Sequence, residues 1–185
     1  PDRLVPSELG EIPEGWEVKK LGDLATVQGG RQLSPAAYTA KGPYPVFGAN
    51  GIMGYTSNAT HEGFVVIVGR VGAYCGSLHW FFGRAWVNNN ACAIVSHRWP
   101  EYVLQALLAA DFYSARQGSA QPFIPNSAIA ALPMLQPPPG PLQSFCSMAR
   151  PLRSLIWELG VQSRTLAAIR DALLPRLISG ELRVK

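Results

Sequence analysis

Arginine, lysine and amide side chains recur in the glycine- and asparagine-rich loops of the first three quarters of this sequence. Guanidinium and ammonium groups hold phosphates, whereas guanidinium and amide groups read base edges in the major groove of duplex DNA. Loops carry such functions because they vary without disturbing the scaffold beneath them. We therefore predict that double-stranded DNA is contacted by Arg31, Gln32, Lys41, Arg70, Arg84, Asn88, Asn89, Asn90, Arg116, Gln117 and Gln121.

A simpler structural explanation stays open for several of these residues. Arg70 would then support the fold, Asn88–Asn90 would form only a polar turn, and Arg116 with Gln117 would simply be solvated. Four tyrosines close to glycines have rings that could stack on an extruded base. We expect these four in the core instead: Tyr38, Tyr44, Tyr55 and Tyr74.

Groups that would support catalysis or hold a metal are not clustered in the sequence. Residues 24–140 contain only three carboxylates, widely separated, whereas a metal-dependent nuclease needs several close together. The glycines of Gly69–Gly76 do not follow the dinucleotide-binding pattern, and Asn88–Ala91 is not the Asn-Pro-Pro-aromatic tetrapeptide of a methyltransferase. The sequence has no Gly-Lys-Ser/Thr phosphate loop, His-Glu-x-x-His helix or serine elbow. We predict no catalytic residues, no metal and no cofactor.

Cysteine usage and apolar run lengths predict a cytoplasmic protein that does not enter a membrane. Cys75, Cys92 and Cys146 are odd in number and widely spaced, so we expect buried free thiols in a reducing compartment. Every apolar run is far shorter than a membrane span, and no basic-then-apolar leader opens the chain. Because the first residue is Pro1 rather than Met, we expect a trimmed sequence or part of a longer product.

Charge is unevenly distributed along the chain, whose net charge is +4. Residues 1–23 carry six acids and three bases, residues 24–140 six bases and three acids, and residues 141–185 seven bases and three acids. An excess of arginine suits a phosphate-lined partner, although many ordinary domains reach the same net charge. With 48% hydrophobic and 15% charged residues, the chain also has enough apolar material for a folded core.

A mixed α/β (α+β) domain, mostly β, is predicted to position the loops. Alternating or continuous apolar runs predict strands, and Ala49-Asn50-Gly51 is typical of a turn. The predicted strands span residues 16–21, 42–47, 64–68, 77–82 and 91–96.

Two helices are predicted in the same domain. Pro100–Ala110 has a proline suited to a first turn, followed by apolar residues at helical spacing. Asn126 or Ser127 is expected to cap a short helix that ends before Pro133. The apolar face of the longer helix is expected to consist of Val103, Leu104, Leu107 and Leu108.

The proline-rich segment Pro137–Pro141 is predicted to divide the chain, because we expect no helix or central strand to run through it. We expect a target-recognition domain over residues 1–136 and a spacer or dimerisation helix within residues 137–185. Pro175 is expected to end or kink the regular part of that helix, and Gly180 to stop it.

Apolar residues in the second region recur with the heptad spacing of a coiled coil. Gln162 is one polar interruption, of the kind that sets register or orientation. A seam over three heptads favours pairing with another helix, while packing on the chain's own domain is the alternative. The predicted dimerisation residues are Leu152, Leu155, Leu159, Gln162, Leu166, Ile169 and Leu173.

Short motifs follow one another in a fixed order along nearly the whole chain. They are Leu9–Val18 with Leu21–Asp23, Gly42–Val46 with Asn50–Ile52 and Gly54-Tyr55, Val68–Gly72, and Leu173–Leu182. In this order they resemble the type I restriction–modification specificity subunits. One departure is that Leu142-Gln143 stands where that family usually has Glu-Gln, so the carboxylate that favours the start of the helix is missing.

The resemblance implies a non-catalytic DNA-recognition subunit. In that family each target-recognition domain, related to the α/β DNA-reading domains of adenine-N6 methyltransferases, reads half of a bipartite site. Two spacer helices pair antiparallel, methyltransferase subunits dock and methylate adenine, and a separate restriction motor–nuclease subunit cuts. This chain has one copy of each module. It is therefore expected to be either a half-sized subunit that forms a homodimer or one half of a full-length subunit with a covalent second half.

The predicted seam has the length of a DNA turn. From Leu152 to Leu173 a helix spans about 33 Å at about 1.5 Å per residue, and one turn of B-DNA is about 34–36 Å. We interpret the helix as a ruler that sets the distance between two half-sites. Two other functions stay open: a protein-interaction module with a dimerising coiled coil and no DNA role, and the recognition domain of a fused restriction–methylation enzyme.

Overall fold

The computed structural model describes residues 3–118 and 120–182. The chain forms two compact units, Pro1–Cys146 and Ser147–Lys185. The described strands and three short helices all belong to the first unit, together with the first turns of a long helix. The second unit contains the rest of that helix.

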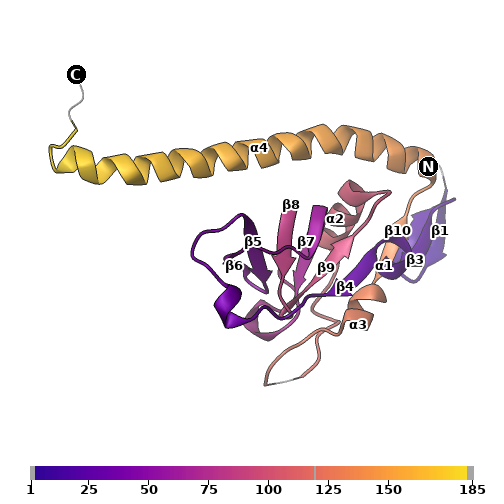
Figure 1. Ribbon diagram of the computed structural model, residues 1–185. Helices are drawn as coiled ribbons and strands as arrows, with labels where there is room; N and C mark the ends of the chain where they lie inside the picture. Colours follow the sequence, from indigo (N-terminus) through magenta and orange to yellow (C-terminus); the bar gives the residue numbers. More distant parts are fainter. Residues whose placement is uncertain (1–2, 119, 183–185) are drawn as a thin grey trace. The chain divides into compact units, whose positions relative to one another are not determined.

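A six-stranded sheet forms the centre of the first unit, in the order β4-β9-β7-β8-β5-β6 (Figure 1). Neighbouring strands are antiparallel except for β5 and β8, which run parallel. The strands are β4 (Thr26–Gly29), β5 (Tyr44–Gly48), β6 (Gly51–Thr56), β7 (His61–Gly69), β8 (Leu78–Val87) and β9 (Ala91–Val95).

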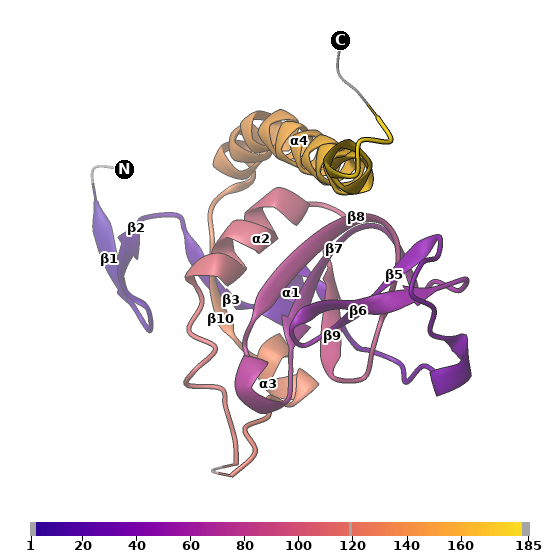
Figure 2. The same cartoon turned by 90° about the vertical axis from the view of Figure 1, so that its left-hand side faces the viewer.

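Two small strand pairs and three helices surround this sheet. β1 pairs antiparallel with β2, and β3 pairs with β10, so the beginning and the end of the first unit meet. α2 lies on one side of the sheet, and α3 lies near α1 and β4 (Figure 2). These elements are β1 (Leu4–Ser7), β2 (Gly10–Pro13), β3 (Glu17–Lys20), β10 (Pro133–Gln136), α1 (Leu21–Leu24), α2 (Pro100–Ala109) and α3 (Asn126–Ala130).

Strand β7 is buried on both faces, which explains the continuous apolar run Phe64–Val68. Successive side chains of a strand point to opposite faces. Val66 and Val68 belong to a core that includes the buried side of α2, whereas Val65 and Ile67 share a second core with residues of β5 and β9. Because β5 and β9 lie on opposite sides of β7 and β8 in the sheet order, this second core requires the sheet to curl around it.

The predicted α/β class is confirmed, and all five predicted strands are present with shifted ends. The largest difference concerns the strand predicted over residues 77–82, which continues as β8 to Val87. Gly83 lies inside β8 with φ +134°, a conformation that favours glycine and lets the ladder pass a bend. The unpredicted strands β1, β2, β4, β6 and β10 are only four to six residues long, too short to show a clear period.

The two predicted helices of the first unit are confirmed, but two details are wrong. Leu108 is 59% exposed, because it lies about 140° around α2 from Val103 and so falls outside the buried face. The N-cap of α3 is Pro125 rather than Asn126 or Ser127, since the extended backbone at Pro125 leads directly into the helix.

The long helix α4 (Pro139–Ile178) begins inside the proline-rich segment that we predict to exclude a helix. The correction has a physical reason: Pro139 and Pro141 occupy the first turn, where backbone N–H groups have no partner within a helix. α4 also continues past Pro175, which therefore does not end it, while Gly180 follows with φ +75° and stops it as predicted.

The first turns of α4 are part of the first unit, because Leu142 and Cys146 are buried in it. The structural division therefore falls after Cys146, later than the boundary predicted from the prolines. The assignment of recognition to residues 1–136 and of pairing to residues 137–185 stays a prediction.

All three cysteines are free and buried, as predicted. Burial raises the pKa of the Cys92 thiol to about 12, so this thiol stays protonated at neutral pH. Among the described residues, no three His, Cys, Asp or Glu side chains are placed so that they could hold a metal ion. None of the helices formed by the same residues has the length and apolar character needed to cross a membrane.

Candidate nucleic-acid interface

Four loops converge at the end of the sheet where β4 and β7 end and β9 begins. We call them the loop cluster: residues 30–32, 70–72, 88–90, and 116–123 without Ser119. Backbone hydrogen bonds of 2.9 Å join each loop to the next: Arg31 N–H to the Val87 carbonyl, Arg70 N–H to Asn90, and Gly72 N–H to Pro122. These loops therefore form one continuous surface although they are far apart in sequence.

Nine of the eleven predicted DNA-contacting residues lie in the loop cluster. Seven of them have exposed side chains, namely Arg31, Gln32, Asn89, Asn90, Arg116, Gln117 and Gln121. The cluster contains no carboxylate, so its guanidinium groups give it a positive charge. An exposed surface of cations and amides has the hydrogen-bonding groups that duplex DNA recognition uses.

Arg70 and Asn88 hold the loop cluster together from within. The Arg70 Nε donates to the Ile124 carbonyl at 3.0 Å, and the half-buried Arg70 side chain thus ties two loops. Asn88 is 5% exposed; its Nδ2 donates to the Tyr38 hydroxyl at 2.6 Å, and its Oδ1 accepts from the Asn90 N–H at 3.2 Å. These contacts favour the structural explanation for both residues, while Asn89 and Asn90 project into solvent.

Arg116 anchors the fourth loop and still presents part of its guanidinium. One guanidinium nitrogen donates to the Cys75 carbonyl, and the group lies 5.0 Å from the centre of the Tyr113 ring. Such a stacked cation keeps its charge at the surface while its position is restricted.

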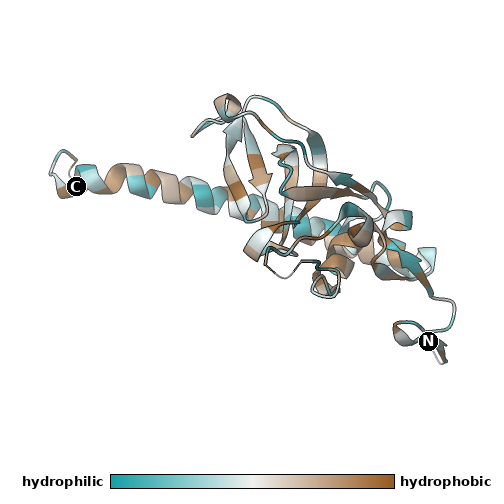
Figure 3. Cartoon of the chain, turned by 90° about the horizontal axis from the view of Figure 1, so that it is seen from below, coloured by the Kyte–Doolittle hydropathy of each residue, from teal (hydrophilic) through white to brown (hydrophobic). Residues whose placement is uncertain are grey.

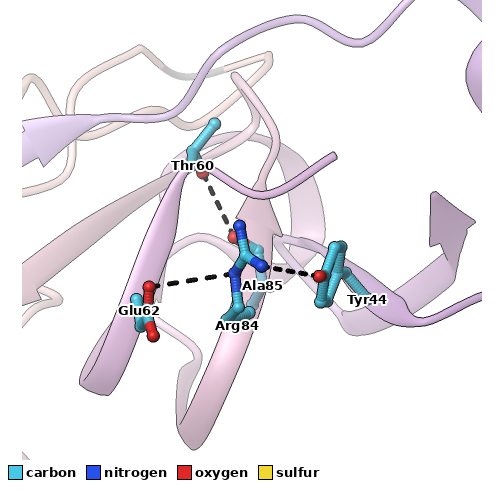
Figure 4. A network of polar contacts seen from close by, with 5 residues as sticks. All are labelled: Tyr44, Thr60, Glu62, Arg84 and Ala85. Atoms are coloured by element: carbon cyan, nitrogen blue, oxygen red, sulfur yellow. Dashed lines mark hydrogen bonds and ion pairs between the residues drawn. The ribbon is translucent and has the colours of Figure 1, made fainter. Parts of the chain in front are cut away.

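Arg84 and Lys41 are not brought into the loop cluster. Arg84 lies within β8, where Nη1 donates to the Tyr44 hydroxyl at 2.7 Å and Nε is 3.8 Å from the Glu62 carboxylate (Figure 4). Lys41 lies in the exposed connection before β5, beside Gly42, which packs against Tyr55. A DNA contact by either residue stays a prediction and would need a second part of the surface.

Arg31 of the loop cluster also affects His61 at the start of β7. Burial lowers the pKa of the His61 imidazole, and the charge of Arg31 lowers it further. His61 is therefore neutral at neutral pH, and its Nδ1 lies 2.8 Å from the Thr60 hydroxyl. The same hydroxyl accepts the Val87 N–H at 3.0 Å, so this contact positions the strand that leads into residues 88–90.

Exposed aromatic rings in or next to the loop cluster, Tyr74 and Phe123, are not among the predicted site residues. Tyr74 is 52% exposed, so its predicted place in the core is wrong, whereas Tyr38, Tyr44 and Tyr55 are half-buried. Phe123 is 39% exposed, and it pairs with Val71 and Gln117 in isolated bridges. No sequence signal marks such rings, because exposure of an aromatic residue depends on which loops pack against it.

A second candidate surface is the apolar stripe of α4 in the second unit. The predicted seam residues are exposed, from 38% for Leu173 to 66% for Leu166. Apolar and polar segments alternate along the helix (Figure 3). Met148, one heptad before Leu155, extends the stripe at its beginning and is 65% exposed. A helix with such a stripe is typical of one that pairs with another helix.

Together, the curled sheet with its joined polar loops and the helix with its apolar stripe define a scaffold with two candidate binding surfaces. Residues 13–141 match the family model described as the type I restriction modification DNA specificity domain. The chain belongs to this family.

Two curated relatives are described as specificity subunits of type I restriction enzymes. The chain is 27% identical over 145 residues to the type I restriction enzyme EcoprrI specificity subunit of Escherichia coli, covering 74% of this chain and 35% of that protein. It is 27% identical over 200 residues to the MjaIX specificity subunit of Methanocaldococcus jannaschii, covering 95% of this chain and 46% of that protein. The chain thus spans less than half the length of these relatives.

Solved structures share the fold. The S subunit of a type I restriction-modification system from M. genitalium superimposes with a TM-score of 0.70 and 14% identity, over 89% of this chain and 46% of that one. The HsdS subunit from Thermoanaerobacter tengcongensis gives a TM-score of 0.58 and 16% identity, over 96% and 48%.

The two roles assigned to residues 88–90 lead to different mutant behaviour. Asn88→Ala removes both amide contacts and leaves Tyr38 Oη and Asn90 N–H without these partners, so we expect a loss of about 1–3 kcal/mol in the free energy of unfolding. The matched control Asn89→Ala, at an exposed position, should change it by less than about 0.5 kcal/mol. Urea denaturation measures both values. Equal stability of the two variants would contradict the structural role of Asn88.

Proposed function

We propose that this chain is the DNA-sequence specificity part of a type I restriction–modification complex. The loop cluster would bind one half of a bipartite target in double-stranded DNA. The chain itself would catalyse no reaction; methyltransferase subunits would dock on it and methylate adenine, and a restriction motor–nuclease subunit would cut. We place the complex in the cytoplasm, which is consistent with the three free thiols.

The single observation that supports this proposal most strongly is that seven predicted contact residues with exposed side chains share one surface without a carboxylate. Membership of the specificity family supports the same role. Within the loop cluster, the exposed side chains of Arg31, Asn89 and Gln121 are suited to bases or phosphates, whereas Arg70 and Asn88 would act by holding the loops.

We further propose that the stripe of α4 pairs antiparallel with the corresponding helix of a second specificity half. In a homodimer the second half would be another copy of this chain; in a full-length subunit it would be covalently attached. Burial of each large aliphatic side chain would stabilise the pair by about 1.5–3 kcal/mol, and this stabilisation would drive the pairing. The polar Gln162 in the seam would help to select one register.

Removal of one loop arginine tests the DNA role. The variant Arg31→Ala is measured in the full chain assembled with its methyltransferase subunits. If Arg31 contacts a phosphate, the variant should bind all duplexes more weakly, and the slope of log affinity against log salt concentration should fall in magnitude by about 1. If Arg31 reads a base, discrimination at one base pair should fall by about 1–3 kcal/mol. Fluorescence anisotropy over a salt series, with duplexes carrying the methylation motif of the host genome, separates these outcomes.

The control for this measurement is Arg98→Ala. Arg98 lies beyond the opposite end of β9, with its guanidinium 5.0 Å from the centre of the Trp99 ring, and its loss should leave binding unchanged. Equal losses of DNA affinity in the two variants would exclude the loop cluster as the interface.

A wild-type assembly without salt-dependent duplex binding would favour a protein-interaction module, and a catalytic domain on the same transcript would favour a fused enzyme.

A charge in the helix stripe tests the pairing. Leu166→Lys at a seam position should raise the dimer dissociation constant about a hundredfold or more, because two leucines lose their burial in each dimer. Ala168→Lys, at an exposed position off the seam, should leave it unchanged. Sedimentation velocity of the full chain gives the mass; a wild-type chain that stays single at high concentration rules out the homodimer.

The ruler hypothesis predicts a change in the DNA target itself. Insertion of one heptad between Leu159 and Leu166 keeps the seam in phase and lengthens the helix by about 10 Å. The non-specific spacer between the two half-sites should then lengthen by about three base pairs at 3.4 Å each. Methylation mapping of a genome carrying the variant measures the spacer, and an unchanged spacer would show that the helix does not set it.

A further inference from the structure

The guanidinium group of Arg70 is partly buried, and only one of its edges is used within the fold. Its Nε donates to the Ile124 carbonyl at 3.0 Å, and the Ile124 N–H donates to the Arg70 carbonyl at 2.8 Å, so the group is fixed in place. Within residues 3–118 and 120–182, no carboxylate forms an ion pair with Arg70, and Nη1 and Nη2 donate to no acceptor. A cation partly removed from water is stabilised by an anion at its unused edge.

Asn126, the first residue of α3, brings a second donor to the same place. α3 packs beside β4 (Figure 1), whose last residue is the exposed Gly29. A Cβ added to Gly29 would lie 2.6 Å from the Asn126 Nδ2 and 3.9 Å from the Arg70 Nη1. Glycine at this position therefore allows the amide and the guanidinium to approach one exposed point of the backbone, which a larger residue would obstruct.

The fold alone does not account for the side chain of Asn126. Its Oδ1 is buried and accepts no hydrogen bond from any described residue, and the N-cap of α3 is Pro125 instead. Its Nδ2 also donates to no group in the described part of the chain. A buried polar atom without a partner costs stability, so an asparagine that makes no bond here needs a reason outside the fold.

We propose that Arg70 and Asn126 together bind one backbone phosphate of the DNA duplex at the edge of the loop cluster. We call this pair of residues the phosphate clamp. The inference rests on the proposed DNA-binding function and adds Asn126 to the residues that carry it. Two donors within 3.9 Å of one point are close enough to bind two oxygens of one phosphate group. The phosphate supplies the negative charge that the guanidinium lacks and an acceptor for each donor.

The phosphate clamp positions the loop cluster and does not read sequence, since a phosphate carries no direct information about its base. Arg70 has two roles: Nε holds two loops together, and the terminal nitrogens face the duplex. The Arg70 N–H also donates to the Asn90 carbonyl at 2.9 Å, so the phosphate clamp is joined by the backbone to the loop that exposes Asn89 and Asn90. A phosphate bound by the clamp therefore holds these amides against the duplex.

Duplexes that carry a single uncharged methylphosphonate linkage test the phosphate clamp. Each duplex of a series replaces one phosphate of the target, and its affinity is measured with the full chain assembled with its methyltransferase subunits. Replacement of the clamped phosphate should lower the affinity of the wild-type assembly about tenfold or more, because a charge-assisted contact is lost. Asn126→Asp places a carboxylate beside the guanidinium, so this variant should bind the unmodified duplex more weakly and lose its sensitivity at that one linkage.

The matched control is Ser127→Asp, which adds the same charge at the exposed neighbouring position of α3. It should keep the wild-type sensitivity at every linkage, including the one that Asn126→Asp no longer detects.

Gly29→Ala gives a second measurement without a change of charge. Its Cβ would displace the Asn126 amide, so the variant should lose sensitivity at the same linkage as Asn126→Asp, with discrimination among base sequences unchanged. If both variants keep the wild-type pattern, or if either alters discrimination at one base pair, the phosphate clamp is overturned and the DNA role of the loop cluster stays in place. A wild-type assembly whose duplex binding does not depend on salt would overturn both.

Discussion

Backbone hydrogen bonds between loops are the constraint on which the candidate interface depends. The N–H groups of Arg70 and Gly72 each donate to a carbonyl of a neighbouring loop, and the N–H of Arg31 donates to the carbonyl of Val87 at the end of β8. Each buried polar backbone group needs such a partner, so the loops satisfy one another instead of water. Side chains attached to this network are held at defined positions, as a surface that distinguishes base sequences requires.

The curled sheet makes this network possible. Because β7 is buried on both faces, its end at Gly69 is held rigidly, and β9 begins directly beside it. Variation in the exposed positions Arg31, Asn89 and Gln121 would alter contacts without disturbing the buried positions below them. A scaffold of this kind accounts for how family members of low identity can share a fold.

The helix works by a different physical principle. α4 presents its apolar stripe in the second unit. The exposed side chains of Leu152, Leu159 and Leu166 contribute favourable free energy only when another surface removes them from water. In the proposed pairing, the helix would carry that contact over a fixed length, since each residue adds about 1.5 Å. Pro175 fits within the rod because the loss of one hydrogen bond near the end of a helix disturbs little of it.

Local patterns in the sequence predicted much of the fold but less of the site. The apolar run Phe64–Val68 predicted a strand and the heptad leucines predicted a helix, because period and composition are local properties of the sequence. The short strands β1 and β10 were missed because they are stable only through their partners. The role of Asn88 was left open because its two amide contacts depend on Tyr38, fifty residues away, and on the turn at Asn90.

The sequence by itself determined the longer strands and helices, the heptad spacing of α4, the buried thiols and the residues with the chemistry to contact DNA, since each of these follows from residue type and spacing. Only the tertiary structure decided which of those residues share one surface and which are used to support it. Those properties depend on hydrogen bonds and packing between segments distant in the chain, and no local pattern encodes them.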